Sequence, residues 1–140
     1  MPIASPEIQA FATGFPLTLL HAAVTLVMLI AGTAVYAMLT PHKEIALIRD
    51  GNAAAAVSLG GVMVGLAIPL SVSLNASTSV LDIFLWGVAT IAVQLLVFRL
   101  VDLVLRGLPQ RIQDGELAAA ALLVAAKVAT ALILAAAVSA

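Results

Sequence analysis

Residues 48–59 read IRDGNAAAAVSL, and residues 112–123 read IQDGELAAAALL. The two stretches place an isoleucine, an Asp-Gly pair and a run of alanines at the same spacing. Each stretch leads into an apolar run long enough to cross a membrane as a helix. The pair therefore predicts that the chain consists of two similar halves, and that each half enters the membrane in the same way.

The composition is typical of a membrane protein. Of the 140 residues, 64% are hydrophobic and 9% are charged, and the mean hydropathy is +1.21. Soluble domains have about 25% charged residues, so too few charges remain here to cover a surface that faces water. The net charge of −1 argues against a nucleic-acid partner, because phosphate binding needs a basic face. Without cysteine, disulfides and thiolate chemistry are excluded.

Four uniformly apolar stretches are long enough to span a bilayer, which takes about 20 residues of helix. They cover residues 15–39, 53–74, 83–105 and 117–138. Continuous apolar runs favour helices over alternating barrel strands, and alanine and leucine are strong helix formers. We therefore predict an all-α integral membrane protein with four transmembrane helices.

The two halves are expected to share one orientation, because each contains two spans. We place repeat one at about residues 15–74 and repeat two at about 82–138, within a single membrane domain of residues 1–140. Five of the six basic residues lie in or beside the two loops within the halves: Lys43, Arg49, Arg99, Arg106 and Arg111. The positive-inside rule assigns these loops to the cytoplasm and both termini to the outside. The first segment lacks the basic start of a signal peptide, so it is expected to stay as a span.

Each of these loops is predicted to form a short interfacial helix that ends in an elbow. A glycine allows the left-handed turn that ends a helix, and a polar side chain after it caps the next span. A carboxylate there also suits the positive end of a helix. We interpret the elbow residues first as capping groups and second as cation-entry ligands; they are Asp50, Gly51, Asn52, Asp114, Gly115 and Glu116.

Small residues four positions apart predict close helix packing within the spans. Gly61 and Gly65 form one such pair, and Ala125 and Ala129 form the pair at the aligned position of the second half. The alternative is chance, because alanine is so common in this chain. Pro69 is expected to kink or end the second span, where freed carbonyls either shape the packing or line a cavity.

Lys127 is the most informative single residue. It lies ten positions after Leu117, which places it about 15 Å deep, near the bilayer centre. A charge at that depth usually faces a bundle interior or a water-filled cavity. One hypothesis is a path for an ion, an anion or a proton; the others are a neutral or paired lysine at an oligomer interface, and exposure to lipid. Gln94 lies at a similar depth and is the expected partner.

Arg99, Asp102 and Arg106 are predicted to lie on one helical face, because they are spaced by three and four residues. The simple interpretation is an ion-paired strip at the cytoplasmic end of the helix. The alternative is a site for anionic lipid headgroups or for gating.

Three stretches carry a family resemblance: LTPHKEIALIRDGNAAAAV at 39–57, GGVMVGLAIPL at 60–70 and WGVATIAVQLLVF at 86–98. They resemble the YjfL-like family, small bacterial inner-membrane proteins grouped as a domain of unknown function. The resemblance implies a four-span helical protein of the inner membrane with two similar halves. It also implies genes placed near phage-shock-like envelope-stress genes, and it supplies no established activity or catalytic residue.

Two functional hypotheses follow, and neither is an enzyme or needs a cofactor or a metal. Flat, alanine-rich helices bury little in one copy, so we expect a homo-oligomer, most simply a dimer, in the lipid bilayer. The first hypothesis is an oligomeric channel or transporter for a small ion or solute, motivated by Lys127, Gln94 and Pro69. The alternative is a non-conducting scaffold of the envelope-stress response that recruits a soluble partner or anionic lipid. Its contacts would be Lys43, Arg49 and Arg111.

Overall fold

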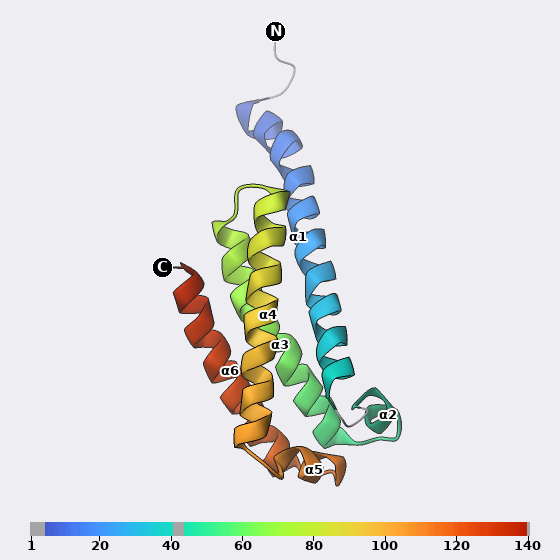
Figure 1. Ribbon diagram of the computed structural model, residues 1–140. Coiled ribbons are helices and arrows are strands. Elements are labelled where there is room, and N and C mark those ends of the chain that lie inside the picture. Colours follow the sequence, from blue (N-terminus) through green and yellow to red (C-terminus); the bar gives the residue numbers. More distant parts are fainter. Residues whose placement is uncertain (1–4, 41–43, 140) are drawn as a thin grey trace.

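The computed structural model describes residues 5–40 and 44–139, and over these residues it is all-helical (Figure 1). Four long helices and two short ones follow in the order α1 Pro6–Leu39, α2 Glu44–Arg49, α3 Ala53–Ala76, α4 Val80–Val104, α5 Leu108–Gln113 and α6 Leu117–Ser139. The four long helices are each long and apolar enough to cross a membrane. The prediction of an all-α membrane protein with four spans is confirmed.

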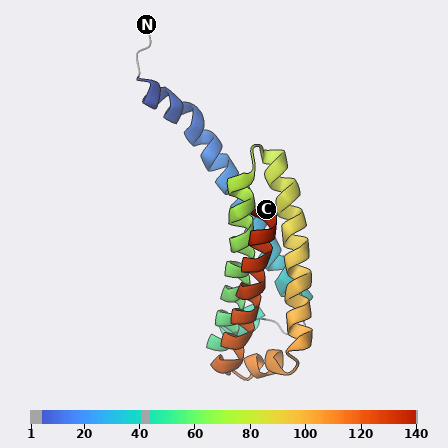
Figure 2. The same cartoon turned by 90° about the vertical axis from the view of Figure 1, so that its left-hand side faces the viewer.

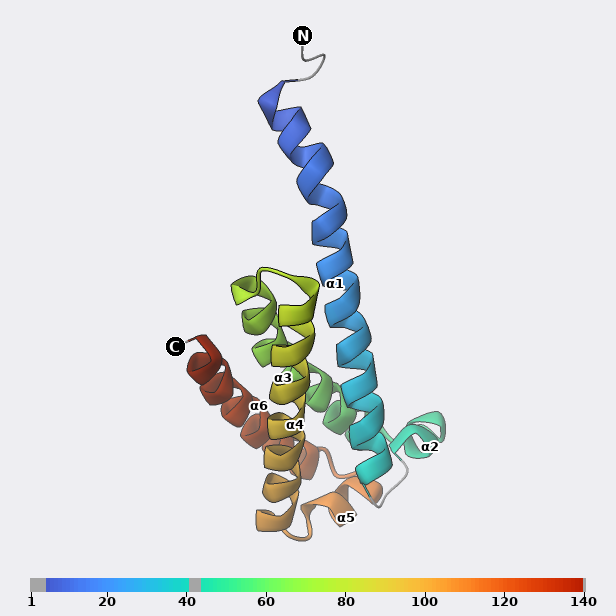
Figure 3. The same cartoon turned by 45° about the horizontal axis from the view of Figure 1, so that its top comes forward.

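The first helix was predicted to begin at residue 15, but it begins at Pro6. Its start follows a capping signal and not the apolar run: the Ser5 hydroxyl accepts from the backbone N–H of Ile8 at 3.3 Å, and Glu7 suits the positive helix end. Its 34 residues rise about 51 Å, well beyond a hydrocarbon core of about 30 Å. The N-terminal part of α1 therefore extends past the other helices (Figures 1 and 3).

Helix α3 is the centre of the bundle. It contacts α1, α4 and α6, and its contact with α6 is the most extensive in the molecule; Figure 2 shows these two helices side by side. Half of the most apolar stretch of α3 is buried, compared with 17% for α1. The short helices α2 and α5 also rest on α3, so both elbows lie at one end of the bundle.

Glycines let neighbouring helices approach α3 closely. A Cβ on Gly61 would lie 2.4 Å from a methyl of Val124 in α6, and one on Gly65 would lie 2.6 Å from the ring of Phe98 in α4. Neither position has room for a side chain. Pro69 is also buried on α3; the helix continues past it to Ala76, so the span does not end there, and the kink stays a prediction.

The alanine pair aligned with these glycines lies on the other side of its helix. Ala125 and Ala129 are exposed, so no other helix in the described part of the chain is packed on them. The buried face of α6 consists of Ala119, Ala120, Leu123, Lys127, Ala131 and Ala135. Helix α6 is therefore turned relative to the face that the alignment of the two halves predicts.

Both predicted elbows are present. Gly51 has a φ of +90° and Gly115 a φ of +84°, as a left-handed turn after a helix requires. In each elbow the next residue donates to the carbonyl five residues back, from Asn52 to Leu47 at 2.9 Å and from Glu116 to Arg111 at 3.0 Å. These are two Schellman motifs with the same geometry. A repeat relating the whole halves stays a prediction.

The side chains of the two elbows behave differently. The Asn52 side-chain oxygen caps α3 by accepting from the N–H of Ala55 at 3.0 Å. Its amide also donates to the carbonyls of Ile112 at 2.9 Å and Gln113 at 3.1 Å, which joins the first elbow to α5. Glu116, predicted to suit the start of α6, has its carboxylate paired with the Arg111 guanidinium instead. The two aspartates of the elbows, Asp50 and Asp114, are exposed.

Candidate functional site

A buried ion pair joins three of the long helices. Lys127 of α6 is 1% exposed, and its Nζ lies 2.9 Å from Oδ1 of Asp102 in α4. The same Nζ donates to the hydroxyl of Tyr36 in α1. That hydroxyl donates in turn to Oδ2 of Asp102 at 2.9 Å. Ammonium, phenol and carboxylate thus form a closed triangle, which we call the Lys127 cluster.

Aromatic rings enclose the ammonium group. Nζ of Lys127 lies 4.6 Å from the centroid of the Tyr36 ring and 5.7 Å from that of Phe98. The two rings pack edge to face, 6.1 Å apart. The faces of such rings attract a cation, and the buried rings also keep water away, which strengthens the electrostatic attraction within the cluster.

The cluster lies toward the end of the bundle that carries the elbows, not at its middle. Tyr36 is close to the end of α1, and Asp102 is close to the end of α4. Side chains on a helix lean toward its N-terminus, so the stem of Lys127 reaches back from a deep Cα toward the start of α6. The ammonium therefore lies at the level of Asp102, and the depth of Lys127 in the bilayer stays a prediction.

Two further charged residues, Arg99 and Glu44, lie close enough to interact with the Lys127 cluster. Nη1 of Arg99 lies 3.7 Å from Oδ2 of Asp102. Glu44, the buried first residue of α2, is near enough for its charge to act on Lys127 and Tyr36. Arg106 is exposed. The predicted strip along α4 is therefore only partly formed, because Asp102 contacts Lys127 and Tyr36 as well as Arg99.

Gln94, the predicted partner of Lys127, lies on α4 about two helical turns before Asp102, further from the elbows. It is fully buried, and its amide donates to the Thr130 hydroxyl at 3.4 Å. Thr130 donates to the backbone carbonyl of Lys127 at 2.8 Å, so Gln94 connects to Lys127 through Thr130 and not to the ammonium. Oε1 of Gln94 has no hydrogen-bond partner within residues 5–40 and 44–139.

Sequence reasoning missed Tyr36, Glu44 and Thr130 as members of this site. Tyr36 is the only tyrosine of the chain, and a tyrosine near the end of a span is ordinarily assigned to the membrane interface. The available signal was depth: Tyr36 and Asp102 both come near the loop end of their spans. Lys43, named as a possible contact residue, lies outside the described residues.

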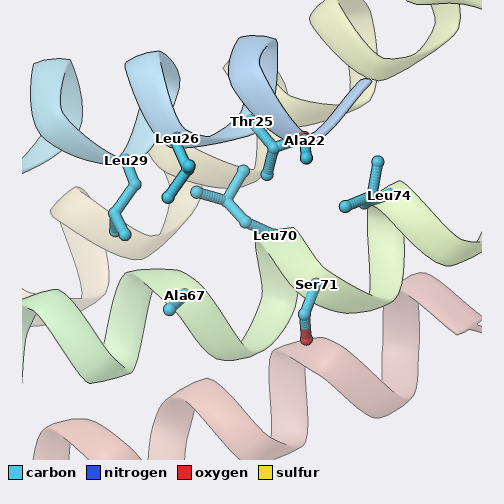
Figure 4. A pocket seen from close by; sticks show the side chains of 8 residues that line it. All are labelled: Ala22, Thr25, Leu26, Leu29, Ala67, Leu70, Ser71 and Leu74. Atoms are coloured by element: carbon cyan, nitrogen blue, oxygen red, sulfur yellow. The ribbon is translucent and has the colours of Figure 1, made fainter. Parts of the chain in front are cut away.

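The grooves on the outside of the bundle are apolar. Figure 4 shows one of about 310 Å³ between α1 and α3. Its two hydroxyls serve their own helices, since Thr25 donates to the His21 carbonyl at 2.8 Å and Ser71 to that of Ile68 at 2.7 Å. The groove therefore offers a mostly apolar surface that suits lipid chains. In the described ranges, no three metal-binding side chains of the His, Cys, Asp and Glu types gather.

Comparison with known proteins supports the membrane assignment. Residues 10–138 match a family described as Domain of Unknown Function (DUF350). The UPF0719 inner membrane protein YjfL of Escherichia coli (strain K12) is 37% identical over 92 residues, 66% of this chain and 70% of that protein. The protein of the same name in Escherichia coli O157:H7 matches equally. No solved structure matches the chain. The resemblance to the YjfL-like family is confirmed.

Proposed function

Because the chain belongs to the Domain of Unknown Function family DUF350, we propose a function from its geometry: an oligomeric channel or transporter for a small ion or solute. Its place would be the bacterial inner membrane, with the elbows in the cytoplasm and both termini outside. The relative YjfL is by name an inner membrane protein. The basic residues Arg49, Arg106 and Arg111 at the elbow end favour this orientation.

The single observation that carries the proposal is the sealed pair of Lys127 and Asp102. Two charges removed from water are costly, and replacing a buried pair with apolar residues is often neutral or stabilising. Stability alone therefore does not explain why a membrane bundle holds this pair. Ionisable groups inside a membrane are typical of ion paths and proton relays.

Polar side chains at three depths supply the elements of a path. The Lys127 cluster is the first level, and Gln94 with Thr130 is the second, about 12 Å further along α4. Ser73 of α3 and Asp82 of α4 lie at the opposite end of the bundle. The three levels together cover about 30 Å, the thickness of a hydrocarbon core.

In this proposal the buried cluster is interpreted as the closed state of the path. Phe98 is fully buried, and it lies between Gln94 and Asp102 along α4. Uptake of a proton or a cation by the Asp102 carboxylate would weaken its attraction for Lys127 and its hydrogen bond from Tyr36. Release of Lys127 would then free α6 to move relative to α1 and α4. Asp102 is accordingly the exchanging group, and Lys127 is its internal counter-ion.

In a homo-oligomer, most simply a dimer, the moving helix α6 would lie at the interface between the copies. Ala125 and Ala129 present small side chains on the exposed side of α6, where a second copy can approach closely. This role for the alanine pair differs from packing within one chain, and chemical cross-linking in native membranes tests it.

Flux across a membrane tests the proposal. Purified protein in proteoliposomes, with pH-sensitive and ion-sensitive dyes inside, should carry at least one small ion. Lys127→Met and Asp102→Asn should each lower that flux at least tenfold. The matched control is Arg111→Gln, which breaks the exposed pair with Glu116 and should leave flux unchanged. Absence of flux in the unmodified protein, or normal flux in Lys127→Met, would refute the proposal.

A second candidate function is the scaffold that recruits a soluble partner or anionic lipid. It is favoured by the exposure of Arg49 and Arg111 beside the two elbows. Arg49→Gln and Arg111→Gln should then abolish capture of the partner or of anionic vesicles without changing the stability of the bundle. Normal capture by both variants would exclude this candidate.

A further inference from the structure

A separate cavity, lined in part by polar side chains, lies at the end of the bundle away from the elbows. It has a volume of about 170 Å³ and is formed where the end of α3, the start of α4 and the end of α6 meet. The chemistry-bearing residues that line the cavity are Ser73, Ser77, Asp82 and Trp86. Asp82 and Asp102 lie at opposite ends of α4, so this cavity is distinct from the Lys127 cluster.

The electrostatics of the cavity favour a cation. Asp82 contributes a carboxylate in the first turn of α4, where it also offsets the positive end of that helix. Helices α3 and α6 both end here, and neither has a basic residue in its last turn. Each of these ends carries a partial negative charge of about half a unit. An anion would meet the carboxylate and two negative helix ends, so it is disfavoured.

Unused oxygen atoms around the cavity suit a ligand that donates hydrogen bonds. Ser73 is 3% exposed, and its hydroxyl has no hydrogen-bond partner among the residues that the structure places. Buried hydroxyls are nearly always hydrogen-bonded, so this one indicates a missing partner. The Ser77 hydroxyl donates to the Ser73 carbonyl at 2.6 Å and keeps its lone pairs free to accept. Asp82 accepts one bond from the Thr78 N–H at 3.3 Å, which leaves most of its acceptor capacity unused.

The size and the aromatic wall of the cavity narrow the choice of cation. The volume of about 170 Å³ has room for a small cation such as ammonium or methylammonium. Trp86 is among the residues that line the cavity and is 54% exposed; an indole ring can attract weakly hydrated cations such as ammonium groups. A divalent metal is disfavoured, because the lining offers a single carboxylate.

We propose that this cavity binds a small ammonium-type cation, either ammonium itself or a short primary amine. Asp82 supplies the counter-charge, Ser73 and Ser77 accept N–H bonds, and Trp86 contacts the cation with its ring. The proposal deepens the proposed function and rests on it for the link to transport: the outer cavity would be the entry site, and its chemistry names the transported class. Binding itself does not depend on flux.

Trp86 is the only tryptophan of the chain, so its fluorescence is a direct probe of the cavity. The full-length protein in detergent is titrated with methylammonium chloride, with ammonium chloride, and with sodium and potassium chloride. N-methyl-D-glucamine chloride, whose cation is too large for the cavity, is the control for ionic strength. We expect a saturable change in Trp86 emission with the two ammonium salts and at least tenfold weaker apparent affinity for sodium and potassium.

Two variants assign the effect to the cavity. Asp82→Asn should weaken methylammonium binding at least tenfold, and Ser73→Ala at least threefold; Ser73→Ala removes only a hydroxyl that lacks a partner, so the fold should be retained. Asp114→Asn, which removes an exposed carboxylate at the elbow end, should bind as the unmodified protein does. Equal responses to all salts, or unchanged binding in Asp82→Asn with unchanged circular dichroism, would overturn the proposal.

Methylammonium uptake by proteoliposomes separates this proposal from transport. Saturable binding without uptake of any ion would preserve the cavity site and refute the transport function. Flux of another ion with no methylammonium binding would preserve transport and refute the site.

Discussion

The two elbows have the same geometry, but the long helices that follow them bury different side chains. Both elbows have the same Schellman hydrogen bonds and a glycine with positive φ. Further along, Met63 of α3 is 43% exposed, whereas Lys127, at the aligned position of α6, is 1% exposed. Similar elbows therefore do not imply that the following helices bury equivalent faces.

The two helices that follow the elbows therefore bury different kinds of side chain. Helix α3 buries small residues and serves as the central packing surface. Helix α6 buries a lysine against partners from α1 and α4. Three comparisons between aligned or neighbouring positions test whether this asymmetry is real.

The largest effect is expected for Lys127→Met, compared with Met63→Leu. Removing the ammonium leaves Asp102 as a buried, uncompensated charge, which costs about 3–5 kcal/mol. The Met63 change lies on an exposed surface and should stay within about 0.5 kcal/mol. Unfolding in sodium dodecyl sulfate, followed by circular dichroism, measures both. In Lys127→Met/Asp102→Leu most of the loss should be recovered; equal losses in the single and double variants would contradict the ion-pair explanation.

A medium effect is expected for Gly61→Ala, compared with its aligned change Ala125→Gly. The new Cβ at Gly61 would overlap the Val124 side chain, and overpacking of this kind costs about 1–3 kcal/mol. Ala125→Gly removes an exposed methyl and should cost about 1 kcal/mol through helix propensity alone.

The adjacent glycine is the control for that experiment. A Cβ on Gly60 meets nothing within 4 Å, so Gly60→Ala should be neutral or stabilising in the same unfolding assay. If Gly60→Ala and Gly61→Ala lose equal stability, the close approach of α3 and α6 is not as described.

The smallest difference in stability is expected between substitutions in the two elbows. Asn52→Ala removes the cap of α3 and both bonds to α5, for a cost of about 1–2 kcal/mol. Glu116→Ala removes an exposed ion pair, worth less than about 1 kcal/mol. Thermal unfolding at low and high salt distinguishes them, because screening should shrink only the Glu116 effect. A larger loss at Glu116 than at Asn52 would reverse our view of the two elbows.

Features of this molecule that depend on nearby residues were predictable from sequence. The four spans follow from length and hydropathy, and the turns at Gly51 and Gly115 follow from a glycine placed after a short helix. The start of α1 was missed because Ser5 and Pro6 signal a helix before its apolar run begins.

Which side of each helix is buried was not predictable, because it depends on residues far away in the sequence. Val124 fits against Gly61 only when α6 is turned so that Ala125 faces outward. The same turn brings Lys127 to Asp102 and Tyr36 rather than to Gln94. Depth along a span is readable from sequence, whereas the rotation of the span about its axis is a property of the packed bundle.

The bond from Asn52 to α5 also has a consequence for biosynthesis. The carbonyls that its amide needs are 60 and 61 residues further along the chain. When the ribosome has delivered α1 to α3 to the translocation machinery, Asn52 already caps its own helix but still lacks these acceptors. We therefore expect the contacts of the first elbow to be completed only after α5 has been synthesised. A nascent chain that is truncated before residue 112 should be a substrate for membrane quality control.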